Sequence, residues 1–263
     1  MGSATRESLS AATATLTKQA SIDLATGEQL LAAALVVDGS GPLRSALSDD
    51  TAAVADRGSI VRAVFGAYTP AAKAVLEALA SGRWSSEDDF VEGIERMGIR
   101  ALAASAPKTV SIDDELFAFS TAVASDPELE LALGGRLGSA VGRVALMETL
   151  LGGKASTQTV SILGALIAHP RGRRTDELVR YAATIVAEES GHTIATVTVA
   201  TALTPVQSER LAQALSAQYD STILINELVD PAILGGMRVQ IGDEVIDGSI
   251  ANRIADLRLR LAS

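Results

Sequence analysis

The sequence predicts a mainly α-helical protein that ends in a small α+β domain. Three observations support this class. Up to about residue 190, apolar residues recur at helical spacing and are largely alanine and leucine. After Glu189 they alternate instead, and β-branched residues dominate. In addition, segments of the helical part recur about 86 residues further along the chain, which predicts duplicated helical bundle units.

The first 104 residues predict six helices, each bounded by recognisable stop and start signals. Gly39 to Pro42 ends one helix, Thr69-Pro70 suits the first turn of another, and Ser86 is placed to cap the last. The expected ranges are 5–20, 27–38, 43–47, 51–66, 69–80 and 87–104.

The internal repeat rests on matching residues at a nearly constant offset. The matches are Leu43, Ala46 and Leu47 with Leu129, Ala132 and Leu133; Arg57 with Arg143; and, after one inserted residue, Val75, Leu76 and Leu79 with Ile162, Leu163 and Leu166. The alternative is that all alanine-leucine helices look alike. The helix at 87–104 ends the first repeat and, at the same offset, begins the second, so either both repeats share it or it breaks near Gly98.

The last part of the chain predicts a β-α-β-β-β-α unit. Alternation at Ala195, Val197 and Val199 indicates a strand, and Thr204 to Gln207 reads as a capping box for a helix that ends near Tyr219. A strand at 222–228, a hairpin with arms at 237–241 and 244–246, and a helix at about 249–262 follow. The predicted domains are therefore 1–104, 105–190 and 191–263.

Composition narrows the classes of function. Lys and Arg number 22 against 32 Asp and Glu, which gives a net charge of −10 and argues against nucleic-acid binding. The absence of cysteine excludes disulfides and thiolate chemistry. No segment reaches the roughly 18 apolar residues of a membrane span, and the N-terminus does not resemble a signal peptide, so we expect membrane association only through partners.

Motifs of catalysis are missing, so we expect no catalytic, cofactor-binding or metal-binding residues. There is no phosphate loop, no HExxH and no GxSxG, and the two histidines, His169 and His192, lie in different predicted domains. Two features remained open. The basic run 171–174 is interpreted as a solvated helix-start loop or as a contact for an acidic partner, and Trp84 as a residue that packs across the two repeats or as an interface anchor.

The stretch from 224 to 255 resembles the C-terminal signature of the delta subunit of F-type ATP synthases, the oligomycin-sensitivity-conferring family. The residues that carry the resemblance are Asp230, Pro231, Gly235, Gly236, Gly242, Asp243, Asp247, Gly248 and Ser249, and we expect them to be structural. Residues from about 105 onward match a delta subunit of usual length, and the added first repeat is similar to the long form found in actinobacteria.

The resemblance implies a non-catalytic stator subunit without a cofactor. Such a subunit links the alpha₃beta₃ head to the b-subunit stalk at the cytoplasmic face of the membrane. Its partners would be N-terminal helices of alpha subunits for the helical part and the b subunits for the C-terminal domain. The added repeat would hold a second alpha subunit or brace the stalk. Two alternatives stay open: a helical adaptor of another assembly, and a small α+β enzyme.

Overall fold

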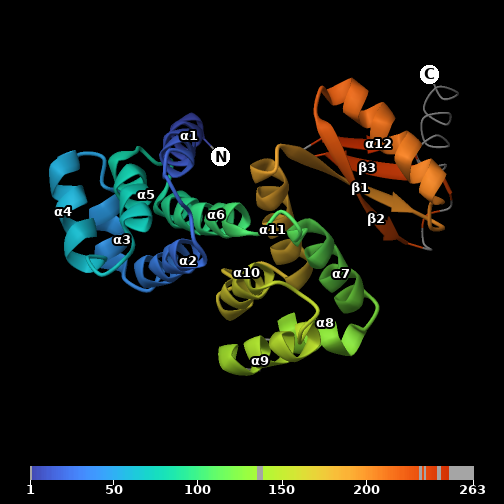
Figure 1. Cartoon of the computed structure of the whole chain (residues 1–263), viewed down its shortest axis with the longest axis horizontal. Helices are drawn as coiled ribbons and strands as arrows, with labels where there is room; N and C mark the ends of the chain where they lie inside the picture. Colours follow the sequence, from blue (N-terminus) through green and yellow to red (C-terminus); the bar gives the residue numbers. More distant parts are fainter. Residues whose placement is uncertain (1, 135–138, 231–232, 234, 242–243, 249–263) are drawn as a thin grey trace, which may run out of the picture. The chain divides into compact units, whose positions relative to one another are not determined.

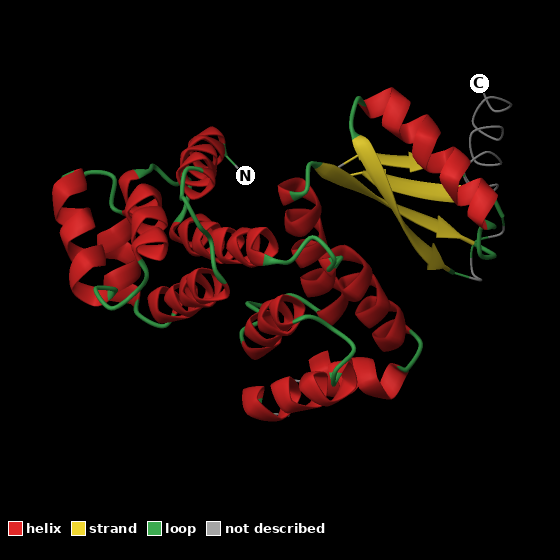
Figure 2. Ribbon diagram, in the orientation of Figure 1, coloured by secondary structure: helices red, strands yellow, loops and turns green. Residues whose placement is uncertain are grey.

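The computed structural model describes residues 2–134, 139–230, 233, 235–241 and 244–248. It forms two compact units, Met1–Val186 and Ala187–Ser263. The described residues of the first unit are helical, and those of the second contain a four-stranded sheet (Figure 2). The expected class, mainly α with a small α+β C-terminal part, is therefore confirmed.

Six helices make up the first bundle, which we define as α1–α6 (Figure 1). Asp23, Ser40, Thr69 and Ser86 each accept a backbone N–H at the start of a helix, which satisfies amides that have no partner within it. The helices are α1 (Ser3–Thr17), α2 (Leu24–Asp38), α3 (Gly41–Ser48), α4 (Val54–Val64), α5 (Pro70–Ser81) and α6 (Glu87–Ser105). The fourth begins later than expected because Asp49 accepts the Thr51 amide and forms a turn first.

Helix α6 is the centre of the first bundle and continues through Gly98 without a break. Its apolar side chains are buried, and its main neighbour is α2. Two glycines allow these helices to lie very close: a Cβ on Gly27 would stand 2.9 Å from the backbone nitrogen of Leu102, and one on Gly98 would stand 3.0 Å from that of Leu31. Any larger residue at either position would push the helices apart.

A second bundle, α6–α11, repeats the order of the first and shares α6 with it. Its helices lie about 86 to 88 residues after their counterparts, so that α7 corresponds to α2 and α10 to α5. The new helices are α7 (Ile112–Ala124), α8 (Pro127–Gly134), α9 (Ala140–Leu151), α10 (Thr157–Ala168) and α11 (Thr175–Glu189).

Equivalent positions in the two bundles make equivalent long-range contacts. In the first bundle, Oε1 of Gln29 accepts the amide of Thr69, the N-cap of α5, at 2.7 Å. In the second, the carboxylate of Glu115 accepts the amide of Ser156, the N-cap of α10, at 3.0 Å. These side chains fix the second helix of each bundle to the start of the fifth.

The fifth helix of each bundle is also capped by an equivalent arginine. The guanidinium of Arg57 donates to the carbonyl of Gly82, and that of Arg143 donates to the carbonyl of Ile167. Cations stabilise the negative end of a helix. Periodicity alone does not produce such contacts between distant residues, so we propose that the two bundles arose by duplication.

The C-terminal unit is a sheet of order β2-β1-β3-β4 with α12 (Pro205–Tyr219) across one face (Figure 2). Its strands are β1 (His192–Val199), β2 (Thr222–Val229), β3 (Met237–Ile241) and β4 (Glu244–Asp247). Helix α12 connects the parallel strands β1 and β2, and β3 and β4 form the expected antiparallel hairpin. Thr204 and Gln207 form the expected capping box. The expected helix at 249–262 lies outside the described residues.

Candidate interaction surface

An apolar groove lies where the two bundles meet, between α2 and α10. From α2 it is lined at helical spacing by Glu28, Leu31, Ala32, Leu35 and Asp38, and from α10 by Ser161, Gly164, Ala165 and Ala168. The groove has a volume of about 400 Å³. Asp38 lies ten residues after Glu28 on the same helix, so the groove extends for about 15 Å, or nearly three turns.

Polar contacts between the two bundles border the groove. The hydroxyl of Ser161 donates to Oε1 of Glu28 at 2.7 Å. Elsewhere along the wall, Nε of Arg171 lies 3.9 Å from Oδ1 of Asp38. Both contacts join α2 to residues more than 130 positions later in the chain, and they hold the walls of the groove at a defined separation.

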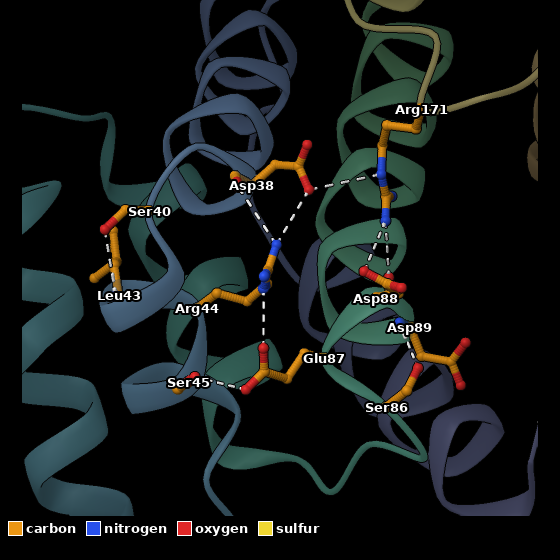
Figure 3. Close-up of polar contacts among 10 residues, drawn as sticks. All are labelled: Asp38, Ser40, Leu43, Arg44, Ser45, Ser86, Glu87, Asp88, Asp89 and Arg171. Atoms are coloured by element: carbon orange, nitrogen blue, oxygen red, sulfur yellow. Dashed lines mark hydrogen bonds and ion pairs between the residues drawn. The ribbon is translucent and has the colours of Figure 1, made fainter.

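Arg171, which reaches Asp38, has its backbone in the left-handed conformation, with φ of 48°. Such a conformation is uncommon for a residue with a side chain. Figure 3 shows the resulting network: Arg44 lies between Asp38 and Glu87, and Arg171 lies between Asp38 and Asp88. The hydrogen bond from Ser45, followed by the contact with Arg44, lowers the pKa of the Glu87 carboxyl.

A second, more buried contact joins Arg173, in the loop before α11, to the shared helix α6. Its Nη2 lies 2.7 Å from Oε1 of Glu95, whose side chain is only 8% exposed. Its guanidinium also lies 4.2 Å from the centre of the Tyr181 ring, a cation–π contact. Burial alone would lower the pKa of Arg173, but the Glu95 carboxylate outweighs this effect and raises that pKa. Burial also raises the pKa of the Tyr181 hydroxyl well above its usual value.

These contacts correct both interpretations of the basic run 171–174. Arg171 binds Asp38 of the first bundle, Arg173 binds Glu95 of the shared helix α6, and Arg174 pairs with Glu130 of the second bundle, so the run is mainly an internal clamp. Sequence reasoning missed this because the acidic partners lie 44 to 133 residues upstream, and nothing local to the run indicates which of many carboxylates it meets.

Trp84 packs within the first bundle. Its ring meets Phe90 edge to face at a centroid distance of 5.5 Å, and its indole N–H donates to the carbonyl of Leu79. A Cβ on Gly93 would collide with the same ring. Trp84 is therefore a packing residue, but it packs within the first bundle and not across the two repeats as expected.

The described signature residues lie at bends around the hairpin of the C-terminal unit. Asp230 directly follows β2, and its amide donates to the carbonyl of Val199, the last residue of β1. Gly235 and Gly236 have φ of 113° and 84°, values that favour glycine, just before β3. Asp247 ends β4, and the amide of Gly248 donates to the carbonyl of Met237. The remaining signature positions, Pro231, Gly242, Asp243 and Ser249, lie outside the described residues.

Within the part of the chain that the structure describes, no cluster of three or more His, Asp or Glu side chains is arranged to hold a metal ion. The same residues contain no single helix with the length and apolarity to cross a membrane; α2 and α3 together pass this test but bend by 109° at their junction.

The groove itself escaped sequence reasoning, although one signal of it was present. Ser161, Gly164, Ala165 and Ala168 form a face of small residues on a helix that is otherwise rich in leucine and isoleucine. Small residues at helical spacing indicate close approach of another helix. The pattern does not show that the opposite wall comes from a helix more than 120 residues earlier.

The fold and the groove define a class of protein with two units, a helical one that offers an apolar groove and a small α+β one. Comparisons with known proteins show the family. The sequence model of the family described as ATP synthase delta (OSCP) subunit matches residues 99–261. The protein called ATP synthase subunit delta in Leifsonia xyli is 50% identical to this chain over the full length of both. The protein of the same name in Kineococcus radiotolerans is 40% identical over 90% of this chain and 87% of its own length.

A third protein of that name, from Streptomyces avermitilis, is 35% identical over 99% of this chain and 96% of its own length. Among solved structures, a chain of the Toxoplasma gondii mitochondrial ATP synthase hexamer is 18% identical and covers 64% of this chain and 97% of its own, with a TM-score of 0.41, which is too low to argue from.

The chain belongs to the ATP synthase delta (OSCP) subunit family. It is a non-catalytic stator subunit of the peripheral stalk and serves ATP synthesis and the ion transport coupled to it. It is a peripheral component of the membrane-bound complex. This membership sets aside both the adaptor of another assembly and the small α+β enzyme. The family match begins at residue 99, inside α6, whereas the relatives also match most or all of the first bundle.

Proposed function

We propose that the helical unit holds an N-terminal helix of an alpha subunit in the groove between α2 and α10. The observation that carries this proposal is the groove itself: it is apolar, nearly three turns long and lined by two helical faces. Amphipathic helices bind such grooves through apolar residues spaced three and four apart. Leu35, which is 41% exposed at the wall, gains a partner when a helix is seated there.

We further propose that the C-terminal unit, Ala187–Ser263, holds the b subunits at the cytoplasmic face of the membrane. Exposed apolar side chains on its edge strand β4, Val245 and Ile246, support a contact there. In this proposal the described signature residues, from Asp230 to Gly248, shape the backbone around the hairpin and bind no ligand.

Two contacts on one chain explain how a subunit without catalytic groups serves ATP synthesis. The head experiences torque whenever the rotor turns, and a stator must keep it from following. Once one contact is formed, the second becomes intramolecular and its effective concentration rises, so the link seldom opens fully. The ionic contacts of Arg171 and Arg173 add stiffness within the helical unit, because they hold the loop before α11 to α2 and to the shared helix α6.

Site-directed cross-linking tests both contacts, and the absence of native cysteine makes each introduced thiol unique. Leu35→Cys in the groove and Val245→Cys on β4 would carry a photoactivatable cross-linker in the assembled membrane complex. We expect Leu35→Cys to give a product with alpha and Val245→Cys a product with b.

Matched controls use exposed positions away from both surfaces. Ala55→Cys on α4 and Ala217→Cys on α12 are exposed residues of the same two units. If Leu35→Cys labels alpha no better than Ala55→Cys does, the groove is not the alpha site. If Val245→Cys yields no b product above the Ala217→Cys background, the assignment of the C-terminal unit is wrong.

A further inference from the structure

The side of the first bundle that corresponds to the groove differs in its packing and its side chains, although the helices correspond. The face of α10 that lines the groove corresponds to a face of α5, and the equivalent residues are Ala74, Glu77, Ala78 and Ser81 for Ser161, Gly164, Ala165 and Ala168. If duplication had preserved the binding surface, α5 would border a similar groove.

The first difference between the bundles is the helix packed on this side. In the first bundle α1 packs extensively along α5, with Ala12 and Leu16 buried and the Ser8 hydroxyl donating to the carbonyl of Arg83 just beyond α5. In the second bundle the helix in the place of α1 is α6. Because α6 makes its main contact with α2, it touches α10 less extensively, and space remains beside α10.

The second difference lies in the side chains. In the first bundle Glu77 forms an ion pair with Arg62 of α4 at 3.0 Å. The residues at these positions in the second bundle are Gly164 and Glu148, which cannot form that pair. At Gly164 a side chain would meet only Met147 and Val144 at ordinary contact distance, so glycine there leaves the wall of the groove open.

We propose that the chain contains a single helix-binding groove, to which the second bundle contributes α10 and the added first bundle contributes α2. The first bundle is then a wall of this receptor and holds no alpha helix by itself. This inference rests on the proposed function, in which an alpha N-terminal helix occupies the groove. It replaces the expectation that the added repeat could grip a second alpha subunit.

The lining also defines the chemistry of the bound helix. Leu31 and Leu35 require apolar side chains on one face, and the small residues of α10 admit large ones. Asp38 is paired with arginines, whereas the contact described for the Glu28 carboxylate at the rim is with the neutral Ser161 hydroxyl. The occupant should therefore carry a basic residue where it passes Glu28.

Binding of a labelled synthetic peptide to the full-length chain tests the inference. The probe is the N-terminal ~20 residues of the alpha subunit from the same complex, enough for the length of the groove. We expect one peptide per chain. Leu35→Glu on α2 should weaken binding at least about tenfold, and Gly164→Leu on α10 should weaken it similarly by filling the groove. Val64→Glu is the control, because Val64 is similarly exposed, at 47%, but lies on α4.

A further variant tests the predicted charge contact. Glu28→Gln retains a hydrogen-bond acceptor for Ser161 but removes the charge, so binding should become less sensitive to salt than in the parent chain.

Each outcome has a distinct meaning. Two peptides per chain, or half of the sites surviving Leu35→Glu, would overturn the single groove. Loss of binding in Gly164→Leu but not in Leu35→Glu would exclude α2 as a wall and overturn the inference, whereas the broader part of the proposed function, that the helical unit holds an alpha helix against α10, would stand. A peptide that does not bind the parent chain, or that binds equally to all variants, would refute the alpha site in the proposed function and the inference with it.

Discussion

Replacement of Gly27 by alanine should destabilise the helical unit by forcing α2 away from α6. The added Cβ would stand 2.5 Å from Cγ of Leu102 and 2.9 Å from its backbone nitrogen. Carbon contacts are favourable from about 3.5 Å, so α2 would have to withdraw by about 1 Å. Overpacking of this kind costs about 1–3 kcal/mol.

The opposing effect is the better helix propensity of alanine, worth about 1 kcal/mol. Gly58→Ala isolates the two effects, because Gly58 is also helical and a Cβ there meets only the flexible end of Arg62, at 3.3 Å. Propensity cancels between the variants, so Gly27→Ala should be less stable than Gly58→Ala by the overpacking cost of about 1–3 kcal/mol. For a unit of this size, each kcal/mol shifts Tm by about 2–4 °C.

Thermal unfolding followed by circular dichroism would measure this difference. A Tm for Gly27→Ala equal to or above that of Gly58→Ala would refute the reasoning, since it would mean that α2 and α6 are not held at the distance described. Because α2 is also a wall of the groove, the Gly27→Ala variant should bind the alpha peptide more weakly than the Gly58→Ala variant does.

Three further predictions concern charges and caps. Arg173→Met leaves the Glu95 carboxylate buried without its partner, so the free energy of unfolding measured in urea should fall by about 3–5 kcal/mol. Adding Glu95→Leu to the same chain should recover most of that loss. A loss below ~1 kcal/mol in Arg173→Met would contradict a buried pair. The pKa of Glu87 is lowered in the folded state, so this carboxylate contributes to stability above its ordinary pKa of 4.5, and the contribution is lost as the pH falls through the folded-state pKa. The Glu87→Gln variant should therefore lose less stability than the parent chain when the pH is lowered. Parallel curves of stability against pH for the two chains would disprove this. Thr204→Ala removes the capping box of α12 and should destabilise the C-terminal unit by about 1 kcal/mol, seen as faster amide exchange there, whereas unchanged exchange would exclude that role.

The ion pairs at the starts of α6 and α11 show why a duplicated chain is hard to interpret from sequence. Arg44 and Glu130 occupy equivalent positions on α3 and α8. Arg44 pairs with Glu87 at 3.0 Å, and Glu130 pairs with Arg174 at 3.1 Å, so the contact recurs with its charges reversed. A comparison of residue types would count these positions as mismatches, although the two bundles use them in the same way.

The elements of this protein were predictable because their causes are local. Helical periodicity, the Thr204 capping box and the alternation at 237–241 each involve residues within a few positions of one another, and each appears in the structure where expected. The family was likewise readable from a short stretch near the C-terminus. The ends of helices were less certain, as at α4, where the Asp49 side chain forms a turn before the helix can begin.

The candidate site depended on contacts that periodicity does not specify. The sequence alone determined that α6 would be a long helix with an apolar face, but not that one helix would serve two bundles. Only the tertiary structure placed α2 beside α10 and brought Arg171 and Arg173 to acidic groups far upstream. The physical reason is range: capping and periodicity act over one or two turns, whereas a groove exists only after separate helices have packed and left a gap between their faces.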